Sequence, residues 1–144
     1  MTFREAIDAL AQELGLAQWE PEPSGHFAIA FEGSVALDLA PGRREEEIVL
    51  SGRITAFDDT TSKEDLVKLL QLNGPAIKYH DEVMTLDREE KALILQRSLN
   101  VKYMQEDVLI REVEGFLNNL EFWVNLTKKD ASSPESSTPF MILP

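Results

Sequence analysis

The chain has 144 residues, a length that allows one domain with a sizeable core. Its 26 acidic side chains outnumber the 14 basic ones and leave a formal charge of -12, which does not suit a nucleic-acid partner. The absence of cysteine excludes thiol catalysis, disulfides and thiolate metal sites. We find neither a secretory signal nor a stretch of about 18 apolar residues, and we therefore expect a soluble, cytoplasmic protein with no membrane partner.

The first predicted element is an amphipathic helix over residues 2–14. Thr2 and Glu5 have the spacing of a capping box, and apolar residues follow at helical spacing. Gly15 suits the first position after the helix. Two prolines in the connector Trp19–Gly25 then exclude a further helix, because proline removes a backbone donor and restricts the residue before it.

Three antiparallel strands are predicted next, because the period of the apolar residues changes from 3.6 to 2. They are expected over Phe27–Phe31, Val35–Leu39 and Ile48–Ile54. The second face of these strands carries small or apolar side chains where a solvated sheet normally carries Lys, Glu or Thr: Ala28, Ala30, Ala36, Val49 and Ser51. Such a face either lies under a helix or accepts another chain.

A second helix is predicted from Thr61 or Ser62 to Asn73, and Gly74 with Pro75 ends it. Its apolar residues cover an arc of about 220°, whereas one core-facing stripe needs roughly 100°. These residues are Leu66, Val67, Leu69, Leu70 and Leu72. Either the last helix covers the additional apolar surface, or a second copy of the chain buries it in a homodimer.

The last predicted elements are a hairpin and a long helix. The hairpin strands are expected over Val83–Asp87 and Lys91–Leu99, and the helix from about Gln105, with its apolar residues on one stripe. We expect one domain over residues 1–126 and a tail over 127–144 with a polar linker and an apolar end. The order α-βββ-α-ββ-α predicts an α+β fold with a twisted antiparallel sheet packed with helices.

No motif for catalysis or cofactor binding is found. The glycines form neither a phosphate loop nor a dinucleotide fingerprint, and no zinc or calcium motif occurs. The best acidic cluster is His80–Glu82, but three adjacent residues rarely converge on one ion, which favours a solvated turn. His26 is interpreted as a surface or edge-strand residue. We therefore expect no catalytic residue, no cofactor and no metal ion, and an enzyme is the least favoured class.

Several segments together carry a resemblance to a known family. They are the opening helix with Leu14–Leu16, the strands Phe27–Ile54, the run Leu66–Asn73, the strand Ala92–Leu99 and the closing Phe116–Trp123. In this order, and in a small acidic chain without cysteine, they resemble the class I type III secretion chaperones of the CesT/Tir-chaperone family. The resemblance spans about residues 2–126.

The resemblance implies a homodimer whose interface includes Leu66, Leu69, Leu70, Asn73 and Met84. It also implies that the N-terminal segment of a secreted effector wraps around the dimer in non-globular form. The implied anchor sites lie on the first helix and the sheet: Phe3, Ile7, Ala28, Ala30, Ala36 and Val49. Two alternatives stay open: a chaperone-like regulator that sequesters a regulatory protein, and a YbjN-type regulatory module without a role in export.

Overall fold

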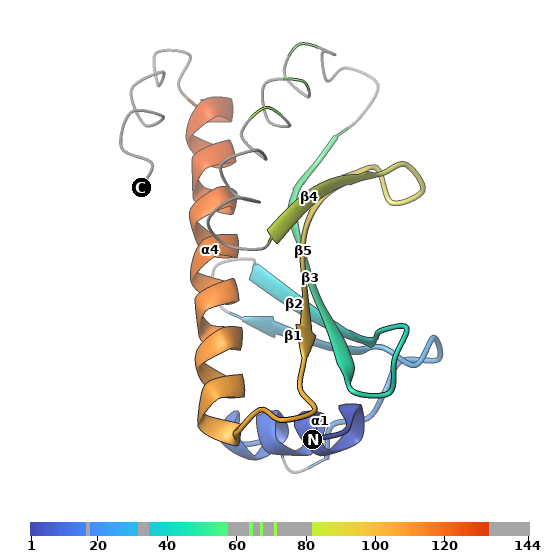
Figure 1. Ribbon diagram of the computed structural model, residues 1–144. Coiled ribbons are helices and arrows are strands. Elements are labelled where there is room, and N and C mark those ends of the chain that lie inside the picture. The colour runs from blue at the N-terminus through green and yellow to red at the C-terminus, as the bar shows by residue number, and fades with distance from the viewer. Residues whose placement is uncertain are drawn as a thin grey trace.

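A computed structural model describes residues 1–16, 18–31, 35–57, 64, 67, 71 and 82–132, the side chains of 128–132 excepted. It confirms the predicted α+β class. The described elements run in the order α1 (Phe3–Glu13), β1 (Phe27–Phe31), β2 (Val35–Pro41), β3 (Glu47–Ala56), β4 (Glu82–Asp87), β5 (Ala92–Asn100) and α4 (Glu106–Ser132). Figure 1 shows the long helix α4 running along the sheet, with α1 across the end of the sheet where α4 begins.

The five strands form one antiparallel sheet in the order β1-β2-β3-β5-β4. The three strands predicted after the first helix and the strands of the predicted hairpin join where β3 pairs with β5, for example at Ser51 opposite Gln96. β1 and β4 are therefore the two edge strands, and β3 lies at the centre of the sheet. Residues 57–91 separate β3 from β5 in the sequence, so no local sequence signal predicts their pairing.

The hydrophobic core lies between one face of the sheet and the helices α1 and α4. Alternate residues of each strand face it, which is the period expected when one face of a sheet is covered. From α4 the core receives the predicted apolar stripe, whose buried members are Leu109, Val113, Phe116, Leu120, Trp123 and Val124. Helix α4 thus packs on the strands β2 and β3 at the middle of the sheet.

Gly52 allows α4 to approach the centre of the sheet closely. A Cβ atom at this position would overlap a methyl group of Leu120 and would lie 3.0 Å from the carbonyl oxygen of Ala36. Any side chain at position 52 would therefore push α4 away from the sheet. The glycine is required by packing, because its backbone is that of an ordinary strand.

The predicted capping box starts helix α1. The Thr2 hydroxyl accepts a hydrogen bond from the backbone N–H of Glu5 at 3.2 Å, and the Glu5 carboxylate accepts one from the N–H of Thr2 at 3.1 Å. The hydrogen bond that the carboxylate accepts from the N–H of Thr2 favours its charged form and is the main cause that lowers the pKa of Glu5 below its ordinary value. The sequence prediction for this end of the helix is confirmed.

The predicted glycine stop ends helix α1 with a Schellman motif. Gly15 has φ 73°, its N–H donates to Gln12 O at 3.2 Å, and the N–H of Leu16 donates to Ala11 O at 2.8 Å. The left-handed residue reverses the chain direction. The segment after Gly15 therefore runs back beside the helix that it has just left.

Two predictions need correction or fall outside the described residues. Glu82 was expected in a solvated turn, but it is the first residue of β4 and its exposure is only 1%. The turn interpretation is wrong for Glu82, because Arg97 and Asn119 bind its carboxylate in the interior of the protein. Most of the second predicted helix lies outside the described residues, in which only Glu64, Val67 and Gln71 of that segment are helical and exposed.

Candidate binding surface

The outer face of β1, β2 and β3 is exposed and carries small side chains. Ala28, Ala30 and Ala36 are exposed, Val49 is half-buried, and Ala30 stands opposite Ala36 in the register. The helices α1 and α4 both pack on the opposite face. The sequence left open whether this face lies under a helix or accepts another chain. None of the described helices covers it.

The same outer face continues across the sheet to β4. Ser51 of β3 lies opposite Gln96 of β5, and Gln96 lies opposite Val83 of β4, whose side chain is 41% exposed. Two charged side chains of this face have partners. Asp38, which stands opposite Ala28 and Ser51 in the register, has its Oδ2 2.9 Å from His26 Nδ1, and Arg53 lies 3.5 Å from Glu90. Around the paired Asp38 the face carries small, uncharged side chains, a composition that suits contact with another chain.

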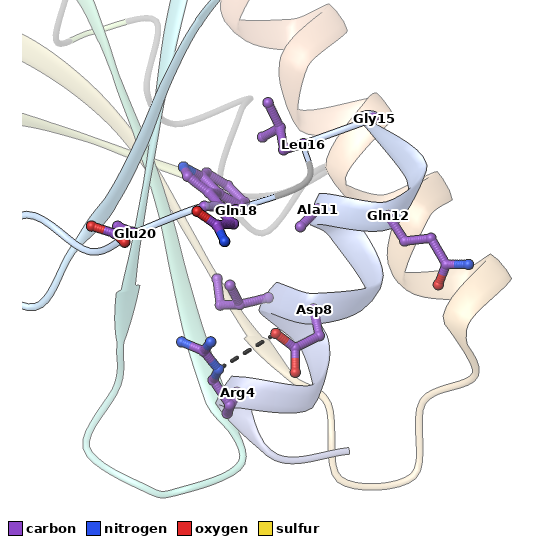
Figure 2. A pocket seen from close by; sticks show the side chains of 10 residues that line it. Arg4, Asp8, Ala11, Gln12, Gly15, Leu16, Gln18 and Glu20 are labelled. Atoms are coloured by element: carbon purple, nitrogen blue, oxygen red, sulfur yellow. Dashed lines mark ion pairs between the residues drawn. The ribbon is translucent and has the colours of Figure 1, made fainter.

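A groove of about 660 Å³ lies between α1 and the segment that returns beside it. Figure 2 shows Arg4, Asp8, Ala11 and Gln12 along the helix, with Leu16, Gln18 and Glu20 on the returning segment. Ile7, Gly15 and Trp19 complete the lining. The groove exists because the Schellman motif at Gly15 folds the chain back on the helix.

Trp19 fixes one wall of this groove to the edge of the sheet. Its indole Nε1 donates to Ala28 O at 3.1 Å, and its ring meets the edge of the Phe27 ring at a centroid distance of 5.4 Å. Nearby, the N–H of Glu22 donates to His26 O at 2.7 Å. The connector therefore satisfies carbonyl oxygens at the start of edge strand β1 and protects that part of the edge from other strands.

The structure locates some of the residues predicted to bind an effector or a second copy. Phe3 is half-buried with its ring 6.1 Å from that of Phe27, and Ile7 is 1% exposed at the floor of the groove. Met84 is buried in the core at 4% exposure. The predicted interface residues Leu66, Leu69, Leu70 and Asn73 lie outside the described residues. The binding roles of all these residues stay predictions.

A buried polar network joins the edge strand β4 to helix α4. The Glu82 carboxylate pairs with the Arg97 guanidinium and accepts a hydrogen bond from Asn119 Nδ2 at 2.6 Å. Arg97 Nη1 also donates to the Glu112 carboxylate at 3.0 Å. Side-chain exposure is 10% for Arg97 and 1% for Glu82, so the interior and not the solvent must satisfy these charges.

Sequence reasoning missed this network and the returning wall of the groove. The signal for Arg97 was its place in β5, at the same parity as the buried Leu95 and Leu99, which puts a charge on the core face. The signal for the wall was Trp19, a large aromatic residue in an otherwise polar connector. Neither signal identifies the partner, because each partner comes from a distant segment.

The described residues show neither a metal cluster nor a membrane-spanning helix. No three His, Asp or Glu side chains within them gather closely enough to hold a metal ion. No described helix is long and apolar enough to cross a membrane. The candidate sites in the described part of the chain are two surfaces: a sheet face of mostly small side chains and the groove beside α1.

These features define a class of small α+β protein that has a helix-covered core and an open sheet face. The amino-acid sequence matches none of the curated proteins. Residues 5–124 match the model of the Tir chaperone protein (CesT) family. The chain therefore belongs to this family, and the resemblance drawn from the sequence is confirmed.

Three solved structures share the fold. A chain of the HopA1–SchA chaperone–effector complex is 16% identical with a TM-score of 0.67, over 85% of this chain and 93% of that chain. A chain of the ExsC–ExsE complex is 15% identical with a TM-score of 0.71, over 88% and 96%. The structure of the Yersinia pestis type III secretion chaperone SycH with a stable fragment of YscM2 gives 22% and 0.60, over 85% and 99%.

Proposed function

We propose that this protein is a cytoplasmic, homodimeric type III secretion chaperone. It binds the N-terminal segment of an effector, keeps that segment soluble and non-globular, and aids its delivery to the secretion apparatus. The function is binding, with no catalytic step and no cofactor. Family membership over residues 5–124 supports the class of function, as does the likeness to chains of chaperone–effector complexes.

The observation that carries the effector-binding part is the open face of small side chains on β1, β2 and β3. An extended segment lying on Ala28, Ala30 and Ala36 can approach the strands closely, because alanine adds little bulk above the sheet. Apolar side chains of the segment then lose contact with water on the small side chains that surround the paired Asp38. The formal charge of -12 keeps the carrier soluble while its cargo is unfolded.

The experiment is co-purification of the tagged full chain from its own bacterium, followed by mapping of the bound region. We expect a secreted protein bound through its N-terminal region. Ala36→Glu is expected to weaken binding at least tenfold, because it adds a long side chain and an unpaired carboxylate among the small side chains of this face. Asn118→Glu, an exposed change on α4, is the control and should keep the wild-type affinity.

Two outcomes would contradict this proposal. Equal binding by the Ala36→Glu and Asn118→Glu proteins would move the effector site away from the outer sheet face. Capture of a partner that is never secreted would instead assign the role of a regulator. Both outcomes can be separated from misfolding, because circular dichroism and a thermal scan of each variant report whether the fold is kept.

The homodimer is tested by multi-angle light scattering at micromolar concentration. Helical Val67 has an exposed side chain, at 43%, which adds to the argument from the leucine-rich arc of its segment. We expect the wild-type chain to have the mass of a dimer. Leu69→Glu is expected to give a monomer, because an interface cannot bury an unpaired carboxylate, whereas Gln71→Glu should leave the dimer intact. A wild-type monomer would remove this part of the proposal.

A further inference from the structure

Edge strand β4 is paired on one side only and lies away from the centre of the helical layer. It pairs with β5, and no described strand pairs with its other edge. Helix α4 packs mainly on β2 and β3. The positions of β4 that face the core are Glu82, Met84 and Leu86. A carboxylate therefore occupies a core position in β4, whereas the core positions of β2 carry only apolar side chains.

This carboxylate stands at the end of β4 that no turn holds. At the other end, the turn into β5 is fixed by Asp87, whose Oδ1 accepts from the N–H of Glu89 at 3.0 Å and of Glu90 at 3.2 Å. Glu82 is the first residue of β4 and stands directly opposite Arg97 in the register. Opening of the hairpin starts away from the turn, because the turn keeps the two strands together at its own end. The Glu82–Arg97 pair is thus placed to hold the free end closed.

Arg97 is shared between a buried carboxylate and a half-exposed one. Its Nη2 pairs with Glu82, whereas its Nη1 lies 3.0 Å from the carboxylate of Glu112 on α4, whose side chain is 40% exposed. Arg97 Nε is buried and has no hydrogen-bond partner among the described residues. Breaking a buried pair is costly mainly because one charge is left without a partner. If β4 leaves the sheet, Arg97 keeps Glu112 and the Glu82 carboxylate reaches water, so neither charge is left buried and unpaired.

We propose that β4 is a detachable edge strand, which opens from its Glu82 end while the other four strands and the described helices stay folded. In the closed state Arg97 joins β4, β5 and α4. In the open state it joins only β5 and α4, through Glu112, so that two arrangements of one guanidinium define two states. Opening exposes the edge of β5 and the side chain of Met84, which is 4% exposed in the closed state. This conformational device goes beyond the proposed function and does not depend on effector binding.

The test is amide hydrogen exchange of the full chain under native conditions, followed by proton–nitrogen NMR. An amide that exchanges through local opening does so faster than one that needs global unfolding. In the wild type, we expect the β4 amides that donate to β5 to exchange at least about tenfold faster than the amides of β3. We also expect their exchange to depend less on added urea, because the opening of one strand exposes less surface than unfolding does.

Two variants that each remove one charge are expected to shift β4 exchange in opposite directions. Glu82→Gln should speed it at least about tenfold, because only the closed state loses an ion pair. Glu112→Gln should slow it about threefold, because the open state loses the remaining carboxylate of Arg97, whereas the closed state keeps Glu82 and loses a like charge beside it. Exchange at β3 should not be slowed by Glu112→Gln. Glu114→Gln, an exposed change on α4, is the control and should alter neither strand.

Three outcomes would overturn the inference. Equal exchange rates at β4 and β3 in the wild type would show that β4 opens only when the whole domain unfolds. Shifts of the same sign in the Glu82→Gln and Glu112→Gln proteins would show that Arg97 does not pass from one carboxylate to the other. Equal effects of Glu112→Gln and Glu114→Gln would assign the change to net charge. If Glu82→Gln fails to fold, Glu112→Gln decides the question by itself, because it leaves the closed pair in place.

Discussion

Arg97→Met is expected to lower the free energy of unfolding by about 3–5 kcal/mol, because it leaves the Glu82 carboxylate buried without its cation. Asn119 Nδ2 would still donate one hydrogen bond to that carboxylate, but no positive charge would remain beside it. The methionine keeps most of the apolar volume of the arginine stem, so the loss reports on charge more than on packing. Urea unfolding followed by circular dichroism measures the change.

Two further variants separate the network from a general effect of charge. The double variant Glu82→Met/Arg97→Met should be more stable than Arg97→Met alone, because no carboxylate is then left unpaired in the interior. Arg53→Met breaks an exposed pair between β3 and Glu90 in the turn that joins β4 to β5, and it should cost less than about 1 kcal/mol. Equal losses for Arg53→Met and Arg97→Met would contradict the role given to burial.

Gly52→Ala is expected to cost about 1–3 kcal/mol, because the new methyl group overlaps Leu120 and pushes α4 away from β3. The comparison is Gly115→Ala in α4, where a Cβ atom would meet no other atom within 4 Å. That change should raise stability by up to about 1 kcal/mol, since alanine is the better helix former. The same chemical substitution thus has opposite expected signs at two glycines.

A double-mutant cycle tests the cause of the Gly52 effect. Leu120→Ala alone should cost about 2–5 kcal/mol through the cavity that it leaves. In the presence of Leu120→Ala, the alanine at position 52 should cost much less, because the overlapping methyl group is gone. Additive losses in the double variant would show that the strain at Gly52 comes from the Ala36 carbonyl and not from the helix.

The predicted binding residues divide into two groups in the structure. Ala28, Ala30 and Ala36 lie together on an exposed face, as the alternation of the strands indicated. Ile7 and Met84 are instead nearly inaccessible, because their side chains pack in the hydrophobic core. Hydrophobicity alone did not distinguish these two positions from exposed ones. Apolar character predicts burial as well as it predicts binding, and only the packing around a residue separates the two.

The amino-acid sequence by itself determined the features that depend on local interactions. The capping box at Thr2, the Schellman motif at Gly15 and the stripe from Leu109 to Val124 each need only residues a few positions apart. The alternation of strands β1 to β3 likewise predicted which side chains face the core. These predictions succeeded because helix ends and periodicity are set within about one or two turns of chain.

The tertiary structure decided what depends on distant partners. It joined β3 to β5, brought α4 onto Gly52, buried Glu82 against Arg97 and Asn119, and set Trp19 beside α1 to form a groove. The residues around a charged side chain do not indicate which distant residue will pair with it. The residues around a glycine likewise do not indicate which side chain will pack against it. The physical reason is that packing and ion pairing are properties of juxtaposed segments, and the order of residues does not state that juxtaposition.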